Sequence, residues 1–219
     1  MNRPHVIVNC AMSADGKIAL PTGKQLRISS DEDMKRVYEL RHQCDAVLVG
    51  IGTILVDNPK LTVKDSYVQN PCQPLRVVLD AQGRTPSDAF VVNDAAETVI
   101  FTTNQHIKKV HVQRGQVHAC PETTQGILDL HYVLSVLFER GIRTLLVEGG
   151  STIIWSFFHE HLVDEFFLYI GSFIIGGDQT PTVAGGQGIV SQKDIIPLHL
   201  CNLQQLGTGV LLHYKSRSS

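Results

Sequence analysis

Apolar residues follow two spacings along the chain: short continuous runs, and stripes in which they recur every three or four positions. The short runs predict strands and the stripes predict helices. Strands are predicted over residues 5–10, 45–49, 75–80, 98–103, 116–120, 143–147, 164–170 and 209–214, and helices over 30–44 and 126–140. Strands that alternate with helices predict an α/β fold, with a mixed, mostly parallel central sheet flanked by helices.

Both predicted helices carry end signals. In the first, Met34, Val37 and Tyr38 share one face, and Ser30 precedes it as an N-cap with Asp33 three residues later, close to a capping box. Gly141 is placed to end the second helix.

The last third of the chain has fewer helical stripes, so antiparallel strands are expected at one edge of the sheet. The sequence contains no linker-like stretch, internal repeat or low-complexity segment. With 219 residues, 43% of them apolar, the chain can bury one good core. We therefore expect a single domain over residues 1–219.

Charge and cysteine content exclude several classes of protein. A net charge of −2 argues against a nucleic-acid surface, and no apolar run reaches the roughly 18 residues of a membrane span. The five cysteines are widely spaced and never form a C-x-x-C pair, which is typical of a reduced, cytoplasmic protein. The stretch from His159 to His161 lacks H-E-x-x-H spacing, so no metal site is expected.

Candidate chemistry begins where the predicted strand 45–49 ends. Gly50 and Gly52 allow close approach of a ligand to the backbone, and Thr53 and Asp57 lie four residues apart, on one face of a helical turn. A Rossmann fingerprint is excluded, because its third glycine is replaced by Leu55 and its long helix is cut short by Pro59.

A second strand-end turn follows residues 143–147. Glu148 precedes Gly149 and Gly150, and Ser151 or Thr152 is expected to cap the next helix. The free N–H groups of such a helix start attract phosphate.

Arg41 lies on or beside the inward face of the first helix. It is either a structural residue, in a buried ion pair with a nearby acid or with its charged end reaching solvent, or a phosphate anchor suited to its forked donors. The pattern leaves both interpretations open.

Taken together, these segments resemble the reductase of riboflavin biosynthesis, the dihydrofolate-reductase-like RibD C-terminal domain. The matching segments are NCAMSADGKI (9–18), LR (40–41), DAVLVG (45–50), TILVDNPKLTV (53–63), PLRVVLD (74–80) and VEGG (147–150). They occur in the family's order. The stand-alone chain is most similar to the archaeal and fungal reductase, which acts before deamination.

The resemblance implies two sets of site residues. NADPH contacts are expected from Ala11, Thr53, Asp57, Gly149, Gly150, Ser151 and Thr152. The substrate pocket is expected to contain Arg41, Leu61, Lys64 and Glu148, with the two basic residues near the sugar phosphate.

Three positions depart from the family's bacterial members. Arg27 stands where they carry an aromatic residue beside the nicotinamide, Lys64 replaces an arginine, and Ala81 replaces a serine found in some members. Lysine keeps the charge but loses the bidentate fork.

The implied activity is NADPH-dependent reduction of the ribosyl side chain of 2,5-diamino-6-ribosylamino-4(3H)-pyrimidinone 5′-phosphate to ribityl. Glu148 is the first candidate for holding the substrate and relaying a proton, and Asp15 is the second. The alternatives are the deaminated uracil as substrate, or a non-catalytic nucleotide-binding relative. A folate reductase is disfavoured, on the argument that the first long helix lacks that family's acid.

Members of the family are dimers, and we expect a homodimer here. The apolar residues 166–170 and 173–175 are predicted to be either a central buried strand or an edge covered by a partner, because an exposed apolar edge invites aggregation.

Overall fold

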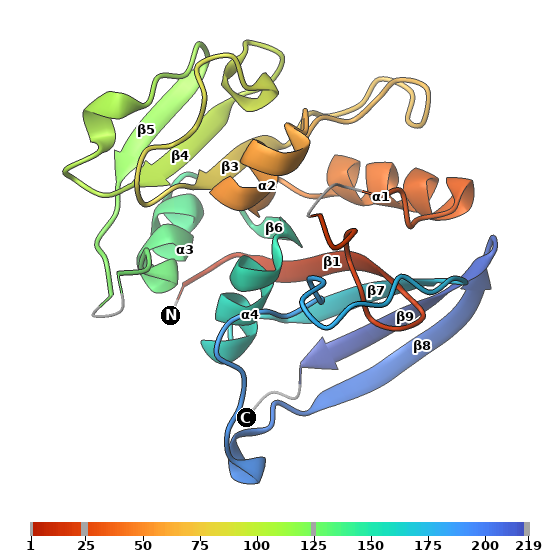
Figure 1. Cartoon of the computed structure of the whole chain (residues 1–219). Coiled ribbons are helices and arrows are strands. Elements are labelled where there is room, and N and C mark those ends of the chain that lie inside the picture. The colour runs from red at the N-terminus through yellow and green to blue at the C-terminus, as the bar shows by residue number, and fades with distance from the viewer. Residues whose placement is uncertain (1, 23–25, 124–125, 217–219) are drawn as a thin grey trace. The chain divides into compact units, whose positions relative to one another are not determined.

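The computed structural model describes residues 2–22, 26–123 and 126–216 (Figure 1). The chain divides into two compact units, one of Met1–His5 with Tyr38–Leu146 and the other of Val6–Val37 with Val147–Ser219. The boundaries fall inside strand β1 (His5–Ser13), inside helix α1 (Asp31–Gln43) and inside strand β6 (Thr144–Gly149).

The first unit contains a parallel sheet in the order β5-β4-β3-β2. Its strands are β2 (Ala46–Gly50), β3 (Leu75–Leu79), β4 (Thr98–Thr102) and β5 (Gly115–Ala119). Every residue of β2, β3 and β4 is buried, which explains why these strands read as continuous apolar runs. Helices α2 (Ile51–Asp57) and α3 (Leu130–Glu139) belong to this unit, with short 3-10 turns at Phe90–Val92 and Ile107–Lys109.

Arg76 is a fully buried charged residue within β3. Its guanidinium donates to Thr98 Oγ1 (2.8 Å) and to the carbonyl oxygens of Phe90 (2.9 Å), Asn93 (2.7 Å) and Ala96 (2.7 Å). Burial lowers the pKa of Arg76 to about 10. The arginine therefore fixes the connection between β3 and β4 to the sheet.

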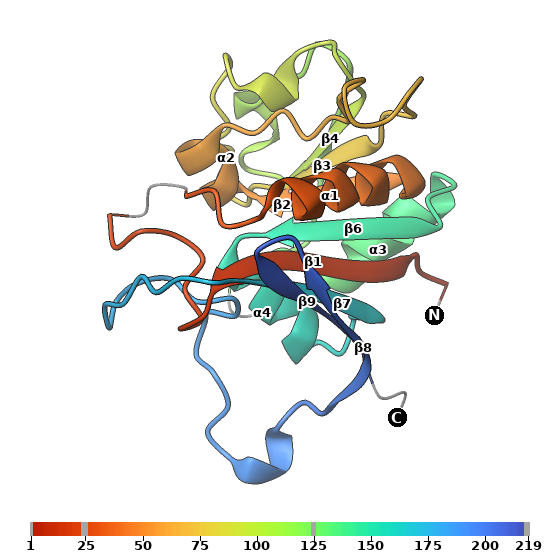
Figure 2. The same cartoon turned by 90° about the vertical axis from the view of Figure 1, so that its right-hand side faces the viewer.

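The second unit contains strands in the order β1-β7-β9-β8 (Figure 2). They are β1 (His5–Ser13), β7 (Glu165–Gly171), β9 (Gly209–Ser216) and β8 (Leu198–Leu206). The β1–β7 pair is parallel, whereas β7–β9 and β9–β8 are antiparallel. Helix α4 (Ser151–His159) and a 3-10 turn at Gln192–Asp194 complete this unit.

The mixed, mostly parallel α/β fold with antiparallel C-terminal strands is confirmed. Each predicted strand is present, but β8 was not predicted. The prediction of a helix from residue 126 is wrong at its start: α3 begins at Leu130, because the Asp129 side chain accepts from the Tyr132 N–H and caps it. The predicted Ser30 cap is confirmed, since Ser30 Oγ accepts from the Asp33 N–H at 3.2 Å.

Strand β7 is hydrogen-bonded on both sides, so the apolar stretch 166–170 is a central strand of its unit. The end position in this unit's strand order belongs to β8, where Leu200 and Leu203 are 46% and 61% exposed.

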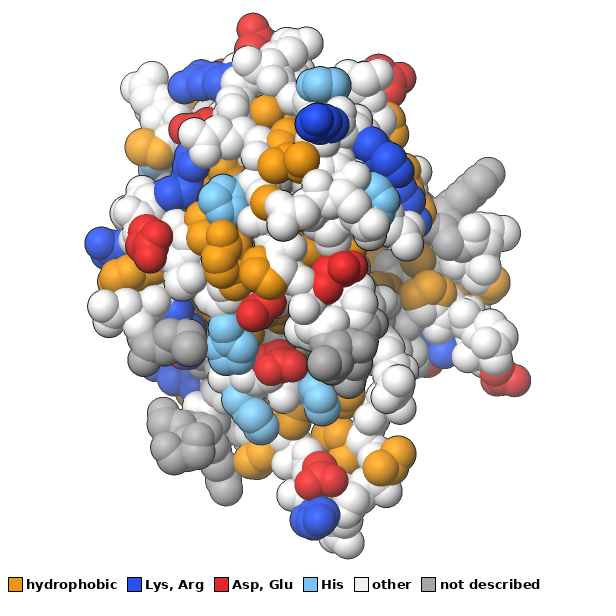
Figure 3. All heavy atoms as spheres, turned by 90° about the vertical axis from the view of Figure 1, so that its left-hand side faces the viewer, with side chains coloured by type: hydrophobic (Ala, Val, Ile, Leu, Met, Phe, Trp, Pro, Cys, Tyr) orange, Lys and Arg blue, Asp and Glu red, His pale blue; other side chains and the backbone are white. Residues whose placement is uncertain are grey.

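Of the helices that the structure describes, none combines the length and apolarity needed to cross a membrane. On the face shown in Figure 3, acidic, basic and histidine side chains are interspersed with apolar ones.

Candidate active site

The first strand-end turn is part of helix α2. Gly50 is its N-cap, and Thr53 and Asp57 share one face of it, as predicted. A Cβ added at Gly52 would have, among the described residues and apart from its chain neighbours and the backbone of its own helix, no atom within 4 Å. Asp57 Oδ1 is buried and has no hydrogen-bond partner among the described residues, and burial raises the pKa of this carboxyl group. The turn therefore presents an unsatisfied acceptor beside a glycine with open space.

Asn58 ends α2 in the left-handed conformation, with φ of 41°, and its N–H donates to the Ile54 carbonyl. Its side-chain oxygen accepts from the Phe90 N–H at 2.9 Å. The Asp57–Pro59 segment thus terminates a helix in addition to its candidate role. Leu61 is 1% exposed and also has a positive φ of 52°, a conformation that is unfavourable for a branched residue.

Arg41 and Lys64 meet at one aromatic ring. Arg41 Cζ lies 5.4 Å and Lys64 Nζ 5.5 Å from the centroid of Tyr38, which stacks on Tyr67 at 4.4 Å. Arg41 Nη1 also donates to the Thr62 carbonyl at 3.2 Å. The two predicted phosphate ligands are therefore brought together, although 23 positions separate them in the sequence.

The second strand-end turn starts helix α4. Gly149 has a φ of 116°, and apart from its chain neighbours the described residues place one atom, Ile154 Cδ1 at 3.9 Å, within reach of an added Cβ. The prediction that Ser151 or Thr152 caps this helix is wrong, because the N-cap is Gly150, which has no side chain to cap the first turn. The amide groups of that turn can therefore receive an anion. Glu148 is half-buried at the end of β6, directly before the glycines, and the Gly149–Gly150 peptide is cis.

Asp15 is held in place by three donors. Its Oδ1 accepts from Ser13 Oγ (2.5 Å) and from the Ile175 N–H (3.1 Å), and its Oδ2 accepts from the Gly176 N–H (2.6 Å). The Ser13 hydroxyl, together with these amides, lowers the pKa of Asp15 to about 2. The carboxylate anchors the segment after β7, which places Gly176 next to this turn.

The remaining predicted positions lie in ordinary structural contexts. Ala11 is half-buried on β1 opposite Tyr169. Arg27 forms an exposed ion pair with Asp31. The carbonyl of Ala81 accepts from Thr103 Oγ1 at 3.0 Å.

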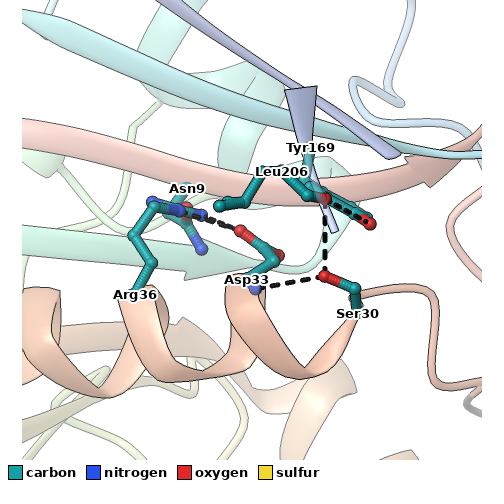
Figure 4. A network of polar contacts seen from close by, with 6 residues as sticks. All are labelled: Asn9, Ser30, Asp33, Arg36, Tyr169 and Leu206. Atoms are coloured by element: carbon teal, nitrogen blue, oxygen red, sulfur yellow. Dashed lines mark hydrogen bonds and ion pairs between the residues drawn. The ribbon is translucent and has the colours of Figure 1, made fainter. Parts of the chain in front are cut away.

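A buried polar network in the second unit was missed from the sequence (Figure 4). Arg36 donates to both Asp33 and Asn9. The argument against a folate reductase was also wrong, because the first turn of α1 carries Asp31, Glu32 and Asp33, and Asp33 is only 1% exposed. The position of Asp33, three residues after the Ser30 cap, was the feature of the sequence that could have identified it as an acid of the first helical turn.

Sequence comparison places these turns in a known family. Residues 4–212 match the profile of the RibD C-terminal domain. The chain belongs to this family. The match covers both strand-end turns and the Arg41–Lys64 pair.

A 2,5-diamino-6-ribosylamino-4(3H)-pyrimidinone 5′-phosphate reductase from Methanothermobacter thermautotrophicus is 41% identical over 213 residues, which cover 97% of this chain and 98% of the relative. The crystal structure of a Thermotoga maritima deaminase and 5-amino-6-(5-phosphoribosylamino)uracil reductase is 28% identical, with a TM-score of 0.79 over 98% of this chain and 57% of that protein. The fold alone is shared with Enterococcus faecalis dihydrofolate reductase, with a TM-score of 0.55 at 10% identity over 98% and 97% of the two chains.

Like its relatives of this family, the chain is a pyrimidine phosphate reductase, and the dihydrofolate-reductase-like fold class is confirmed. No group of three or more His, Cys, Asp or Glu side chains among the described residues could hold a metal ion. None of the five cysteines, all of which lie in the described ranges, forms a disulfide.

Proposed function

We propose that this chain is an NADPH-dependent reductase that converts the ribosyl side chain of 2,5-diamino-6-ribosylamino-4(3H)-pyrimidinone 5′-phosphate to ribityl in riboflavin biosynthesis. The observation that carries the proposal is the full-length similarity to a reductase named for that substrate. The two glycine turns and the paired cations support it, because they provide what a dinucleotide and a sugar phosphate require.

The reaction acts on C1′ of the sugar. The ribosylamine ring opens to an imine, C1′=N, and reduction saturates this bond. NADPH, when bound, would supply the hydride for C1′, and the imine nitrogen would gain a proton. The protein's task is to orient the carbon against the cofactor and to exclude water.

Each turn, taken by itself, has features that suit one part of the cofactor. The amides at the start of α4, which Gly150 leaves uncapped by a side chain, would hold the pyrophosphate, with Ser151 and Thr152 beside it. The buried, unpartnered Oδ1 of Asp57 would accept from a hydroxyl or amide of the dinucleotide, and Thr53 lies one turn earlier on that face. Ala11 offers a small side chain on β1, where a larger one would obstruct a flat ring.

Arg41 and Lys64 would bind the 5′-phosphate of the substrate. Both cations lie within 5.5 Å of the Tyr38 ring centroid, so a dianion bound beside this ring would be attracted by two positive charges. Buried Leu61 lies three residues before Lys64 and would contribute an apolar wall to the same pocket.

Glu148 would hold the substrate and relay the proton to the imine nitrogen. It is half-buried, which allows a carboxylate to reach substrate while partly shielded from water. Asp15 remains the second candidate, but its oxygens already accept from Ser13, Ile175 and Gly176, so we favour an anchoring role for it.

We further propose that the enzyme acts in the cytoplasm as a homodimer whose interface includes the C-terminal strands. The exposed leucines of β8, Leu200 and Leu203, support this assignment, because an uncovered edge strand is prone to aggregate. Light scattering should give twice the chain mass of 24.2 kDa. A monomer mass at micromolar concentration would contradict the assignment.

The test of the activity is NADPH oxidation by the purified protein, followed at 340 nm, with the diaminopyrimidinone and the deaminated uracil substrates in parallel. Oxidation that matches ribityl product one to one supports the proposal. Failure to oxidise NADPH with either substrate overturns it and favours a non-catalytic relative.

A further inference from the structure

Asn9 on β1 and Asp33 on α1 bind the same guanidinium (Figure 4). Arg36 Nη2 donates to Asn9 Oδ1 at 2.7 Å, while its Nε lies 2.8 Å and its Nη2 lies 2.7 Å from Asp33 Oδ1. The side chain of Arg36 is 18% exposed, whereas Asn9 is 8% and Asp33 is 1% exposed. Arg36 also lies over the ring of Phe167 on β7, at 5.6 Å.

This arrangement fixes which polar atoms remain unused. Both contacts from Arg36 to Asp33 go to Oδ1, and the buried Oδ2 has no hydrogen-bond partner among the described residues. A guanidinium can only donate, so Asn9 must turn its oxygen to Arg36, which leaves the amide nitrogen on the other side. Within the described part of the chain, that nitrogen has no acceptor.

A structural role accounts for only half of the network. The contacts of Arg36 with Asp33 and Asn9 hold the start of α1 against the sheet. One oxygen of the Asp33 carboxylate would suffice for that role. A buried carboxylate oxygen without a donor is unfavourable by about 1–3 kcal/mol or more. In native proteins such an atom binds an ordered water, an ion or a ligand, or has a catalytic role.

The position of the unused pair suits the pyrimidine. Asn9 and Ala11 are two residues apart and on the same face of β1, which is a separation of about 7 Å. We infer that Ala11 contacts the nicotinamide ring of the cofactor, so that the reacting C1′ lies beside this residue. The pyrimidine ring, joined to C1′ through one nitrogen, therefore has the reach to place its far edge at Asn9 and Asp33.

We propose that Asp33 and Asn9 recognise the 2-amino-4-oxo edge of the diaminopyrimidinone and make the enzyme selective for it over the deaminated uracil. Asp33 Oδ2 accepts from the 2-amino group and N3–H, and the Asn9 amide nitrogen donates to the 4-oxo oxygen. Arg36 is a positioning residue that orients both side chains. This inference rests on the proposed function and identifies the determinant of its substrate.

The selectivity follows from the chemistry of position 2. The diaminopyrimidinone presents donors at C2 and N3, which a carboxylate accepts. The uracil presents a carbonyl oxygen at C2, which would face the Asp33 carboxylate with two lone pairs opposed. A buried site made to bind a donor discriminates strongly against a substrate that lacks it. Position 4 is a carbonyl in both substrates, so Asn9 does not discriminate.

The test is the ratio of kcat/KM for the two substrates, which is independent of the fraction of folded enzyme. In the wild type the ratio should favour the diaminopyrimidinone. Asp33→Asn replaces the acceptor with an amide of the same shape that can donate to the uracil oxygen, and should reduce the ratio by at least about tenfold. Asn9→Ala should lower kcat/KM for both substrates and leave their ratio within about twofold of the wild-type value. Glu32→Gln makes the same change of charge on an exposed neighbour and should leave kcat/KM for both substrates unchanged.

An Asp33→Asn enzyme with an unchanged ratio would overturn the inference, and so would a wild type that prefers the uracil. If Asp33→Asn does not fold, a substrate analogue without the 2-amino group provides the same test on the wild type. Its kcat/KM should fall by at least about tenfold, and an unchanged value would overturn the inference. A wild type that reduces neither pyrimidine would instead refute the proposed function.

Discussion

The backbone amide of Gly176 donates a 2.6 Å hydrogen bond to Oδ2 of Asp15, 161 positions earlier in the chain. With the Ile175 amide on Oδ1, it fastens the segment after β7 to the turn after β1. A carboxylate that accepts from two backbone amides and a serine hydroxyl holds its charge to low pH. The turn that resembles a simple Asp-Gly hairpin therefore organises a distant segment.

This anchor predicts a pH dependence of stability. The pKa of Asp15 is lowered from 3.8 to about 2, so the folded state favours the ionised form. The stabilisation is complete above pH 3.8 and is lost as the pH falls towards 2. The melting temperature of the wild type should exceed that of Asp15→Asn by a constant amount from pH 7 to pH 4, and the difference should shrink below about pH 3.8. A difference that persists at pH 2.5 would show that the carboxylate charge is not the stabilising element.

Arg76→Met should destabilise the protein by more than about 3 kcal/mol. The change leaves the buried Thr98 hydroxyl and the carbonyls of Phe90, Asn93 and Ala96 without their donor. Urea unfolding measures the loss, and exposed Arg84→Met is the control, with an expected change below about 0.5 kcal/mol. Equal effects of the two substitutions would contradict the organising role of Arg76.

Gly150→Val should abolish stabilisation of the protein by NADPH. Excess NADPH at 100 times its dissociation constant should stabilise the wild type by about 2.7 kcal/mol. Gly150 has φ of −70° and ψ of −171°, which valine tolerates, so the variant should fold while its side chain occupies the proposed pyrophosphate position. Thermal melts with and without NADPH make the measurement. Normal stabilisation of the variant would mean that the turn is structural.

Arg41→Met should weaken substrate binding by about 1.5–3 kcal/mol and leave NADPH binding unchanged, because a charged hydrogen bond to the phosphate is lost. Lys60→Met removes a cation of the same unit that lies over Phe90 instead, and is the control. Calorimetry with each ligand separates the outcomes. An equal loss of affinity for both ligands, or a loss of protein stability alone, would favour a structural role for Arg41.

The sequence predicts those parts of the fold in which burial is uniform. Strands β2, β3 and β4 are recognisable because every residue in them is buried, which produces continuous apolar runs. Strand β8 is mostly exposed, and its register with β9 shifts between Leu200 and Asn202, so it has neither an apolar run nor regular alternation.

The candidate site also contains features that the sequence predicts and features that it does not. The glycine turns are local features and can be recognised from the sequence, whereas the contacts of Arg36 with Asn9 join positions 27 apart and depend on how α1 lies on β1. The N-cap at Gly150 also differs from the serine or threonine expected by propensity. At that position the absence of a capping side chain leaves the first amides of α4 available, which is what the proposed pyrophosphate site requires.

Transfer of deuterium from C4 of NADPH to the product tests whether C1′ is reduced directly. The purified protein would be incubated with the diaminopyrimidinone substrate and NADPH deuterated at C4, each face of the ring in turn, and the product analysed by NMR and mass spectrometry. The account predicts a ribityl product that carries one deuterium at C1′ with one of the two labelled cofactors. A product without deuterium at C1′ from either cofactor, or an unreduced ribosyl group, would contradict it.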